Sequence, residues 1–172
     1  MNCNIFLVGF MGTGKSTVGK QLAYKAAMEF KDLDELIELK ESMSISDIFE
    51  KKGESYFRML ESRVLAETVK DTGIVLAAGG GVVLNPANIE MMKSSGIVVG
   101  LAAGLDTIWE RLKDKSDRPL LKGSNPREAL EKIYHQRAGF YDNVHYTVHV
   151  DNKSPSAIAD EILQLVNFNN LK

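Results

Sequence analysis

The stretch that decides the fold is Gly9-Phe10-Met11-Gly12-Thr13-Gly14-Lys15-Ser16-Thr17. It matches G-x-x-x-x-G-K-[ST], the pattern of a loop whose backbone amides bind phosphate groups. Residues 4–9 form a short apolar run typical of a buried strand, and residues 15–28 carry apolar side chains at helical spacing. Because the motif requires a strand before it and a helix after it, we expect a nucleotide site here.

Each residue type in this loop has a physical purpose. Glycines let the backbone curl so that its N–H groups point at phosphates, and the helix that follows adds the positive end of its dipole. Lys15 supplies a cation to the phosphate oxygens, and the Ser16 hydroxyl is placed to ligate Mg²⁺. The alternative is a glycine-rich turn with an exposed lysine, which the specificity of the motif disfavours. The expected nucleotide contacts are Gly12, Thr13, Gly14, Lys15, Ser16 and Thr17.

Further apolar runs alternate with helical segments along the rest of the chain. Residues 73–78, 97–102 and 146–150 read as buried strands. Between them, Phe57, Leu60 and Val64 share one helical face. Strands separated by helices imply parallel pairing through right-handed crossovers, so the pattern predicts an α/β sandwich.

Three prolines mark the starts of helices. Asn85-Pro86, Asn125-Pro126 and Ser154-Pro155 each place a capping residue before a proline at the first helical position, where its missing N–H costs nothing. Glu128 adds an acceptor that can reach back to the second of these caps.

The composition limits the classes of partner. The 172 residues are 44% apolar and 26% charged, with a formal net charge of -2, which is typical of one globular domain without a general nucleic-acid surface. No apolar run approaches the roughly 20 residues that span a bilayer, and residues 1–4 lack the positive region of a secretory signal. Cys3, the single cysteine, cannot form an intrachain disulfide. We expect a cytoplasmic protein that binds neither nucleic acid nor membrane.

Two large classes of nucleotide-binding protein do not fit. The nearest string to the guanine motif N-K-x-D is Asn152-Lys153-Ser154-Pro155, which has proline in place of the aspartate. Motor and transporter ATPases usually end a strand with an acidic residue, whereas residues 74–78 lead into Gly79-Gly80-Gly81. A small-molecule kinase is the remaining common class.

An ordered set of motifs then identifies a family. After the phosphate loop come Asp32-Leu33-Asp34, Gly53 to Glu61 with Arg58 inside it, Gly79-Gly80-Gly81, Arg118-Pro119-Leu120-Leu121, and Arg137 with Tyr141 close behind. This set closely resembles the shikimate kinase family over essentially the whole chain. The resemblance implies a single three-layer P-loop kinase domain, residues 1–172, with a mostly parallel five-stranded sheet flanked by helices. It also implies transfer of the γ-phosphoryl group of ATP to the 3-hydroxyl of shikimate in aromatic amino acid biosynthesis, by a monomer.

The acidic pair is expected to serve the metal and the acceptor. Asp32 and Asp34 follow what looks like an extended segment, so at i and i+2 they would project to the same side. By resemblance, Asp32 joins Ser16 in the Mg²⁺ site, through water, and Asp34 accepts from substrate hydroxyls as a possible general base. The alternative is that both acids favour a helix start.

Arginines and glycines are expected to hold the substrate. By resemblance, Arg58 and Arg137 share the shikimate carboxylate, for which a planar guanidinium suits better than lysine. Arg58 could otherwise be a surface ion-pair residue with Glu54 and Glu61. Glycines after a central strand, at Gly79, Gly80 and Gly81, let backbone amides approach the substrate directly.

A basic stretch is expected to close over ATP. Residues 111–127 hold six basic and two acidic side chains, whereas residues 29–67 hold six basic and eleven acidic ones. The resemblance places a lid at about residues 113–125, in which Arg118 stabilises the transferring phosphoryl group, and a substrate-binding helical region at about residues 33–62. Arg111 and Lys153 are the implied contacts near adenine. A kinase for gluconate or a nucleoside monophosphate, and a silent nucleotide-binding regulator, are the alternatives.

Overall fold

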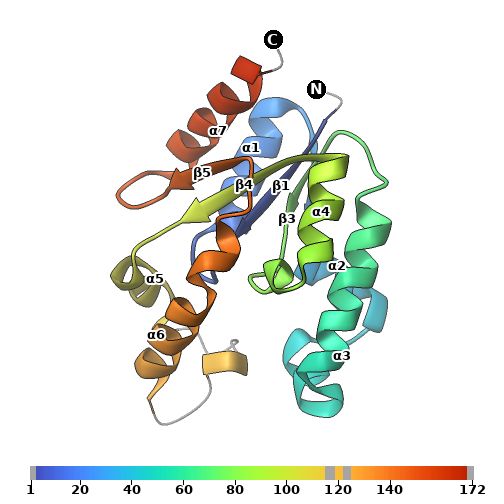
Figure 1. Cartoon of the computed structure of the whole chain (residues 1–172), viewed down its shortest axis with the longest axis vertical. Coiled ribbons are helices and arrows are strands. Elements are labelled where there is room, and N and C mark those ends of the chain that lie inside the picture. The colour runs from blue at the N-terminus through green and yellow to red at the C-terminus, as the bar shows by residue number, and fades with distance from the viewer. Residues whose placement is uncertain (1–2, 115–118, 122–124, 170–172) are drawn as a thin grey trace.

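A five-stranded parallel sheet lies at the centre of the structure (Figure 1). The structure is a computed structural model and describes residues 3–114, 119–121 and 125–169. The strands lie in the order β2-β3-β1-β4-β5, and every neighbouring pair is parallel. The predicted α/β class and five-stranded sheet are therefore confirmed. The strands are β1 (Asn4–Gly9), β2 (Glu29–Asp32), β3 (Ile74–Ala77), β4 (Gly96–Ala102) and β5 (Tyr146–His149).

Helices connect successive strands. The α-helices are α1 (Lys15–Ala26), α2 (Leu33–Glu41), α3 (Ile45–Thr68), α4 (Pro86–Ser95), α5 (Leu105–Leu112), α6 (Pro126–Arg137) and α7 (Pro155–Asn169). Short 3-10 helices are η1 (Val82–Leu84), η2 (Pro119–Leu121) and η3 (Ala138–Tyr141).

Alternation along β1 produces the three layers. Ile5 and Leu7 pack on one face, in a cluster that includes residues of α1 and α7. Phe6 and Val8 pack on the other face, against residues of α2, α3 and α4. Because successive side chains of a strand point to opposite faces, an apolar run buried throughout serves both cores. Figure 1 shows α1 beside α7 on one side of the sheet and α3 beside α4 on the other.

The three predicted helix caps are present. The Asn85 side chain accepts a hydrogen bond from Ala87 N at 3.1 Å, and Asn125 accepts from Glu128 N at 3.4 Å. Ser154 Oγ accepts from Ala157 N at 3.2 Å. Each bond satisfies an amide in the first turn that has no partner within the helix, and so fixes where the helix begins.

Helix α3 changes direction inside its length. Gly53 has φ 83° and ψ 167°, which interrupts the helical path between an N-terminal piece and a longer piece that carries Arg58 and Glu61. The longer piece packs on the sheet through Phe57, Leu60 and other apolar residues, as their spacing predicts. It thereby brings polar side chains to the carboxyl end of β3.

The carboxyl ends of three strands meet at one edge of the sheet. Asp32 of β2 pairs with Ala77 of β3, which also pairs with Leu7, two residues before the end of β1. Ligands of open parallel sheets bind beyond this edge, where strand order reverses. The phosphate loop, the acidic pair and the three glycines all follow these strand ends.

Candidate active site

The phosphate loop wraps around the start of α1. Gly12 and Gly14 have φ values of 81° and 93°, in the left-handed region that glycine adopts without strain. Lys15 Nζ donates to Gly9 O at 2.8 Å and to Phe10 O at 3.1 Å, so its ammonium lies over the loop. The Lys15 cation and the positive end of the α1 dipole therefore both lie at the phosphate loop.

Arg111, which was expected near adenine, also contacts this loop. It lies in the last turn of α5, and its Nη1 donates to Gly12 O at 3.1 Å and to Thr13 O at 3.2 Å. Asp151 holds the other end of α5, accepting from Gly104 N at 3.0 Å and from the Thr107 hydroxyl at 2.6 Å. These bonds lower the pKa of Asp151, the Thr107 hydroxyl contributing most.

The acidic pair is arranged differently from the prediction. Asp32 ends β2 and is the N-cap of α2, whereas Asp34 lies in the first turn of that helix. The expectation that both residues belong to one extended segment was therefore wrong, although both side chains line the same cavity. Asp32 Oδ1 accepts from Asp34 N at 3.0 Å, because a cap residue satisfies the amides of the first turn. Both acids therefore stabilise the start of α2, and this does not conflict with the functional roles predicted for them.

Ser16 and Asp32 form a pair of oxygen donors beside the loop. Ser16 Oγ donates to Asp32 Oδ2 at 2.5 Å, which joins the first turn of α1 to the end of β2. Hydroxyl and carboxylate oxygens are the ligands that Mg²⁺ prefers, so the pair fits such an ion. Within residues 3–114, 119–121 and 125–169, no group of three or more His, Cys, Asp or Glu side chains forms a metal site.

A cavity of about 470 Å³ opens on the phosphate loop. Beyond the loop, its walls include Asp32, Asp34, Arg111 and Lys153, so residues expected at both ends of a nucleotide come together. Lys153 Nζ also pairs with Glu161 at 2.6 Å.

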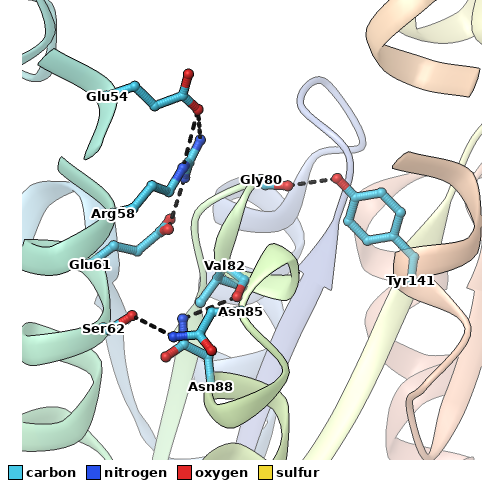
Figure 2. Close-up of polar contacts among 9 residues, drawn as sticks. All are labelled: Glu54, Arg58, Glu61, Ser62, Gly80, Val82, Asn85, Asn88 and Tyr141. Carbon is cyan, nitrogen blue, oxygen red and sulfur yellow. Dashed lines mark hydrogen bonds and ion pairs between the residues drawn. The ribbon is translucent and has the colours of Figure 1, made fainter. Parts of the chain in front are cut away.

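Arg58 is held by two carboxylates of its own helix, α3, as Figure 2 shows. Its Nη1 lies 2.8 Å from Glu61 Oε2, and its Nη2 lies 3.1 Å from Glu54 Oε1. The predicted ion pairs are therefore real. The guanidinium nevertheless lies against the glycines. A Cβ added to Gly81 would overlap its atoms.

Glu61 is the main site residue that the sequence did not predict. It is 1% exposed, and in the described part of the chain its Oε1 has no hydrogen-bond partner. A Cβ on Gly79 would overlap that atom and would lie 3.0 Å from Asp34 Oδ1. Burial raises the pKa of Glu61, Asp34 adds to the rise, and Arg58 opposes it. The only sequence signal was its i+3 spacing from Arg58.

The raised pKa of Glu61 predicts a pH-dependent stability. As the pH rises from 4.5, the ordinary pKa, the unfolded chain releases this proton before the folded chain does, so stability falls. Glu61→Gln removes this dependence, and the difference in Tm between variant and wild type should grow in the variant's favour from pH 4.5 to pH 7. Thermal melts across this range measure it.

Glu54→Gln is the matched control. It removes the other carboxylate beside Arg58, but its side chain is 46% exposed, and no comparable growth is expected. An equal pH trend in both variants would contradict the role given to burial at Glu61.

A second, smaller cavity of about 70 Å³ lies between these residues and the glycines. It shares Met11, Asp34 and Gly80 with the first cavity. One wall is apolar and includes Phe49 and Phe57, whose ring centroids are 4.8 Å apart. The predictions missed this wall. Its other lining residues are Ile45, Arg58, Glu61, Gly79, Gly81, Leu120 and Arg137.

Arg137 reaches this second cavity from the last turn of α6. Both predicted arginines therefore face one cavity from different helices. Leu120 also lines it, whereas Arg118 lies outside the described residues, as does most of the predicted lid. In the part of the chain that the structure covers, no helix has the length and apolar character needed to cross a membrane.

Comparison with known proteins then decides the family. The sequence model of the family described as shikimate kinase matches residues 11–167. The chain belongs to the shikimate kinase family. It is 49% identical over 160 residues to the shikimate kinase of Sulfurihydrogenibium sp. (strain YO3AOP1), covering 93% of this chain and 95% of that protein.

Solved structures agree with this assignment. The shikimate kinase from Acinetobacter baumannii in complex with shikimate superposes with a TM-score of 0.95 and 40% identity, covering 100% of this chain and 97% of that one. A gluconokinase from Sinorhizobium meliloti 1021 has a TM-score of 0.63 at 15% identity, covering 99% and 97%, which shows a shared fold alone. The predicted three-layer P-loop kinase fold of the shikimate kinase family is thus confirmed.

Proposed function

We propose that this chain is an ATP-dependent shikimate kinase that transfers the γ-phosphoryl group of ATP to the 3-hydroxyl of shikimate, giving 3-phosphoshikimate and ADP. The observation that carries the proposal is the meeting of two cavities at Asp34 and Gly80. One is lined by a phosphate loop, and the other by two arginines suited to a carboxylate. Donor and acceptor thus share a wall where transfer takes place.

The donor side positions the phosphates and balances their charge. The loop amides and Lys15 bind the β- and γ-phosphates of ATP. Ser16 would hold Mg²⁺ directly and Asp32 through water. When bound, this ion neutralises phosphate charge. The hydrogen bond between the two residues sets the Ser16 hydroxyl in place before ATP binds.

The acceptor side orients one hydroxyl for in-line attack. Arg58 and Arg137 bind the carboxylate of shikimate, and Gly79, Gly80 and Gly81 offer backbone amides. Asp34, which lines both cavities, accepts the proton of the attacking 3-hydroxyl. Phe49 and Phe57 exclude water from the apolar side of the ring.

The lid and the wider setting complete the proposal. Residues 113–125 form a lid that brings Arg118 to the transferring phosphoryl group, and residues 33–62 form the shikimate-binding region. Arg111 and Lys153 contact the adenine end of ATP. Residues 1–172 act as one domain and as a monomer in the cytoplasm.

Release of ADP with Mg·ATP and a panel of acceptors tests the reaction. We expect turnover with shikimate and none with gluconate or a nucleoside monophosphate. Turnover with either of those acceptors but not with shikimate would overturn the proposal.

Arg58→Ala tests the acceptor side. Because the guanidinium makes charged hydrogen bonds to the substrate carboxylate, its loss should raise KM for shikimate about 100-fold while KM for ATP stays near wild type. Arg63→Ala is the control, since Arg63 lies on the same helix with a side chain that is 67% exposed. A rise in KM for ATP instead would show that Arg58 serves the ATP site, which would contradict its assignment to the shikimate site.

A further inference from the structure

Tyr141 spans the site from η3 to the glycine run. Its hydroxyl donates to Gly80 O at 2.6 Å, across a sequence separation of 61 residues (Figure 2). Its ring packs edge-on against Phe10 of the phosphate loop, with centroids 6.4 Å apart. The side chain packs against both core clusters, which restricts its movement.

This hydrogen bond fixes the direction of the next amide. In a planar trans peptide, the carbonyl of Gly80 and the N–H of Gly81 point in opposite directions. Because the carbonyl points at Tyr141, the N–H points away from it. Gly81 itself lies against Arg58, since an added Cβ would overlap the guanidinium. Within the described part of the chain, no acceptor takes this N–H. Glycine has no side chain to resist rotation of the peptide, so an external contact must hold it.

The phenol of Tyr141 keeps its proton. Burial raises the pKa of Tyr141 to about 12, and the charge of Arg137 opposes the rise. The phenol is therefore neutral at physiological pH and remains a donor to Gly80 O.

We propose that Tyr141 is a positioning residue for the acceptor site, which fixes the Gly80–Gly81 peptide so that its N–H converges with the Arg137 guanidinium on the carboxylate of shikimate. This inference rests on the proposed function. Tyr141 acts through this peptide and does not itself touch the substrate. Its hydroxyl fixes the site before shikimate binds, so that less conformational entropy is lost on binding.

A second tyrosine offers a matched control. Tyr134 packs edge-on against the same Phe10 ring, with centroids 5.4 Å apart, and its hydroxyl donates to Ala103 O at 3.1 Å. It therefore makes the same two kinds of contact as Tyr141. Neither tyrosine lines the second cavity. Gly80, the carbonyl partner of Tyr141, does line it, whereas Ala103, the partner of Tyr134, follows β4 and does not.

Steady-state kinetics of Tyr141→Phe and Tyr134→Phe test the proposal, with Tm measured for both. Tyr141→Phe should raise KM for shikimate about tenfold, the effect of one lost hydrogen bond, and leave KM for ATP within about twofold of wild type. Tyr134→Phe should change neither KM. In Arg137→Ala/Tyr141→Phe, the rise in KM for shikimate should be smaller than the product of the single effects, since both changes act on one contact.

Each result decides the question. Equal effects of Tyr141→Phe on both KM values, an effect matched by Tyr134→Phe, fully multiplicative effects in the double variant, or failure of Tyr141→Phe to fold would make Tyr141 a structural residue only. Absence of shikimate phosphorylation by the wild-type chain would instead contradict the proposed function, and is seen before any variant is compared.

Discussion

Lys15→Ala should lower kcat for shikimate phosphorylation by about 10³-fold, the loss typical of removing one preorganised charge or donor at the transition state. The Lys15 ammonium lies over the phosphate loop, within hydrogen-bond distance of Gly9 O and Phe10 O. Charge on the transferring phosphoryl group therefore develops next to a cation that is already in place. Single-turnover kinetics with saturating Mg·ATP measure the change, because they separate chemistry from binding and product release.

Lys20→Ala provides the comparison within the same helix. Lys20 is exposed, and its Nζ lies 5.6 Å from the centroid of the Phe30 ring. It should keep wild-type kcat and KM. A fall of less than about tenfold for Lys15→Ala, in a variant that still folds, would show that the loop amides stabilise the phosphoryl group largely without the lysine.

Asp34→Asn should lower kcat by about 10²- to 10⁴-fold, the range for loss of a general base. The substitution keeps size and hydrogen-bonding capacity but cannot accept the proton of the attacking hydroxyl. KM for ATP should stay near wild type, since the loop that binds phosphate is unchanged. Rates measured across pH should also lose any acid limb that depends on this carboxylate.

Glu35→Gln controls for the loss of charge at the start of α2. Glu35 is the exposed neighbour of Asp34 in the same first turn, so it shares the helix dipole but lines neither cavity. It should leave kcat unchanged. A reduction of only a few-fold in Asp34→Asn would show that this residue orients the hydroxyl and that the proton leaves by another route.

Features encoded by neighbouring residues were predictable from the sequence. The phosphate loop and the three Asn or Ser caps depend on a few adjacent residues, and each occurs where expected. The apolar runs placed four strands to within one residue. In β1, β3 and most of β4, burial on both faces leaves little room for polar positions. The prediction that β5 is buried was wrong, since only Val148 of its four residues is buried.

Features that depend on packing between distant elements were not predictable. Glu61 is buried because α3 packs closely against Gly79. The contact of Tyr141 with Gly80 joins elements that are far apart in sequence. The local pattern around Asp34 favoured an extended segment, but the cap at Asp32 starts a helix one residue earlier. Spacing alone made Arg58 a surface ion-pair residue, and only the family resemblance suggested its role.

The wall shared by the two cavities has a consequence for inhibitor design. Met11, Asp34 and Gly80 border both spaces, so no protein layer separates the terminal phosphate of one ligand from the hydroxyl of the other. A single compound that joins a nucleotide to a carboxylated ring would need a bridge no longer than the transferred group itself. Such a compound would gain from the high effective concentration of its second half, and its selectivity would come from the carboxylate end.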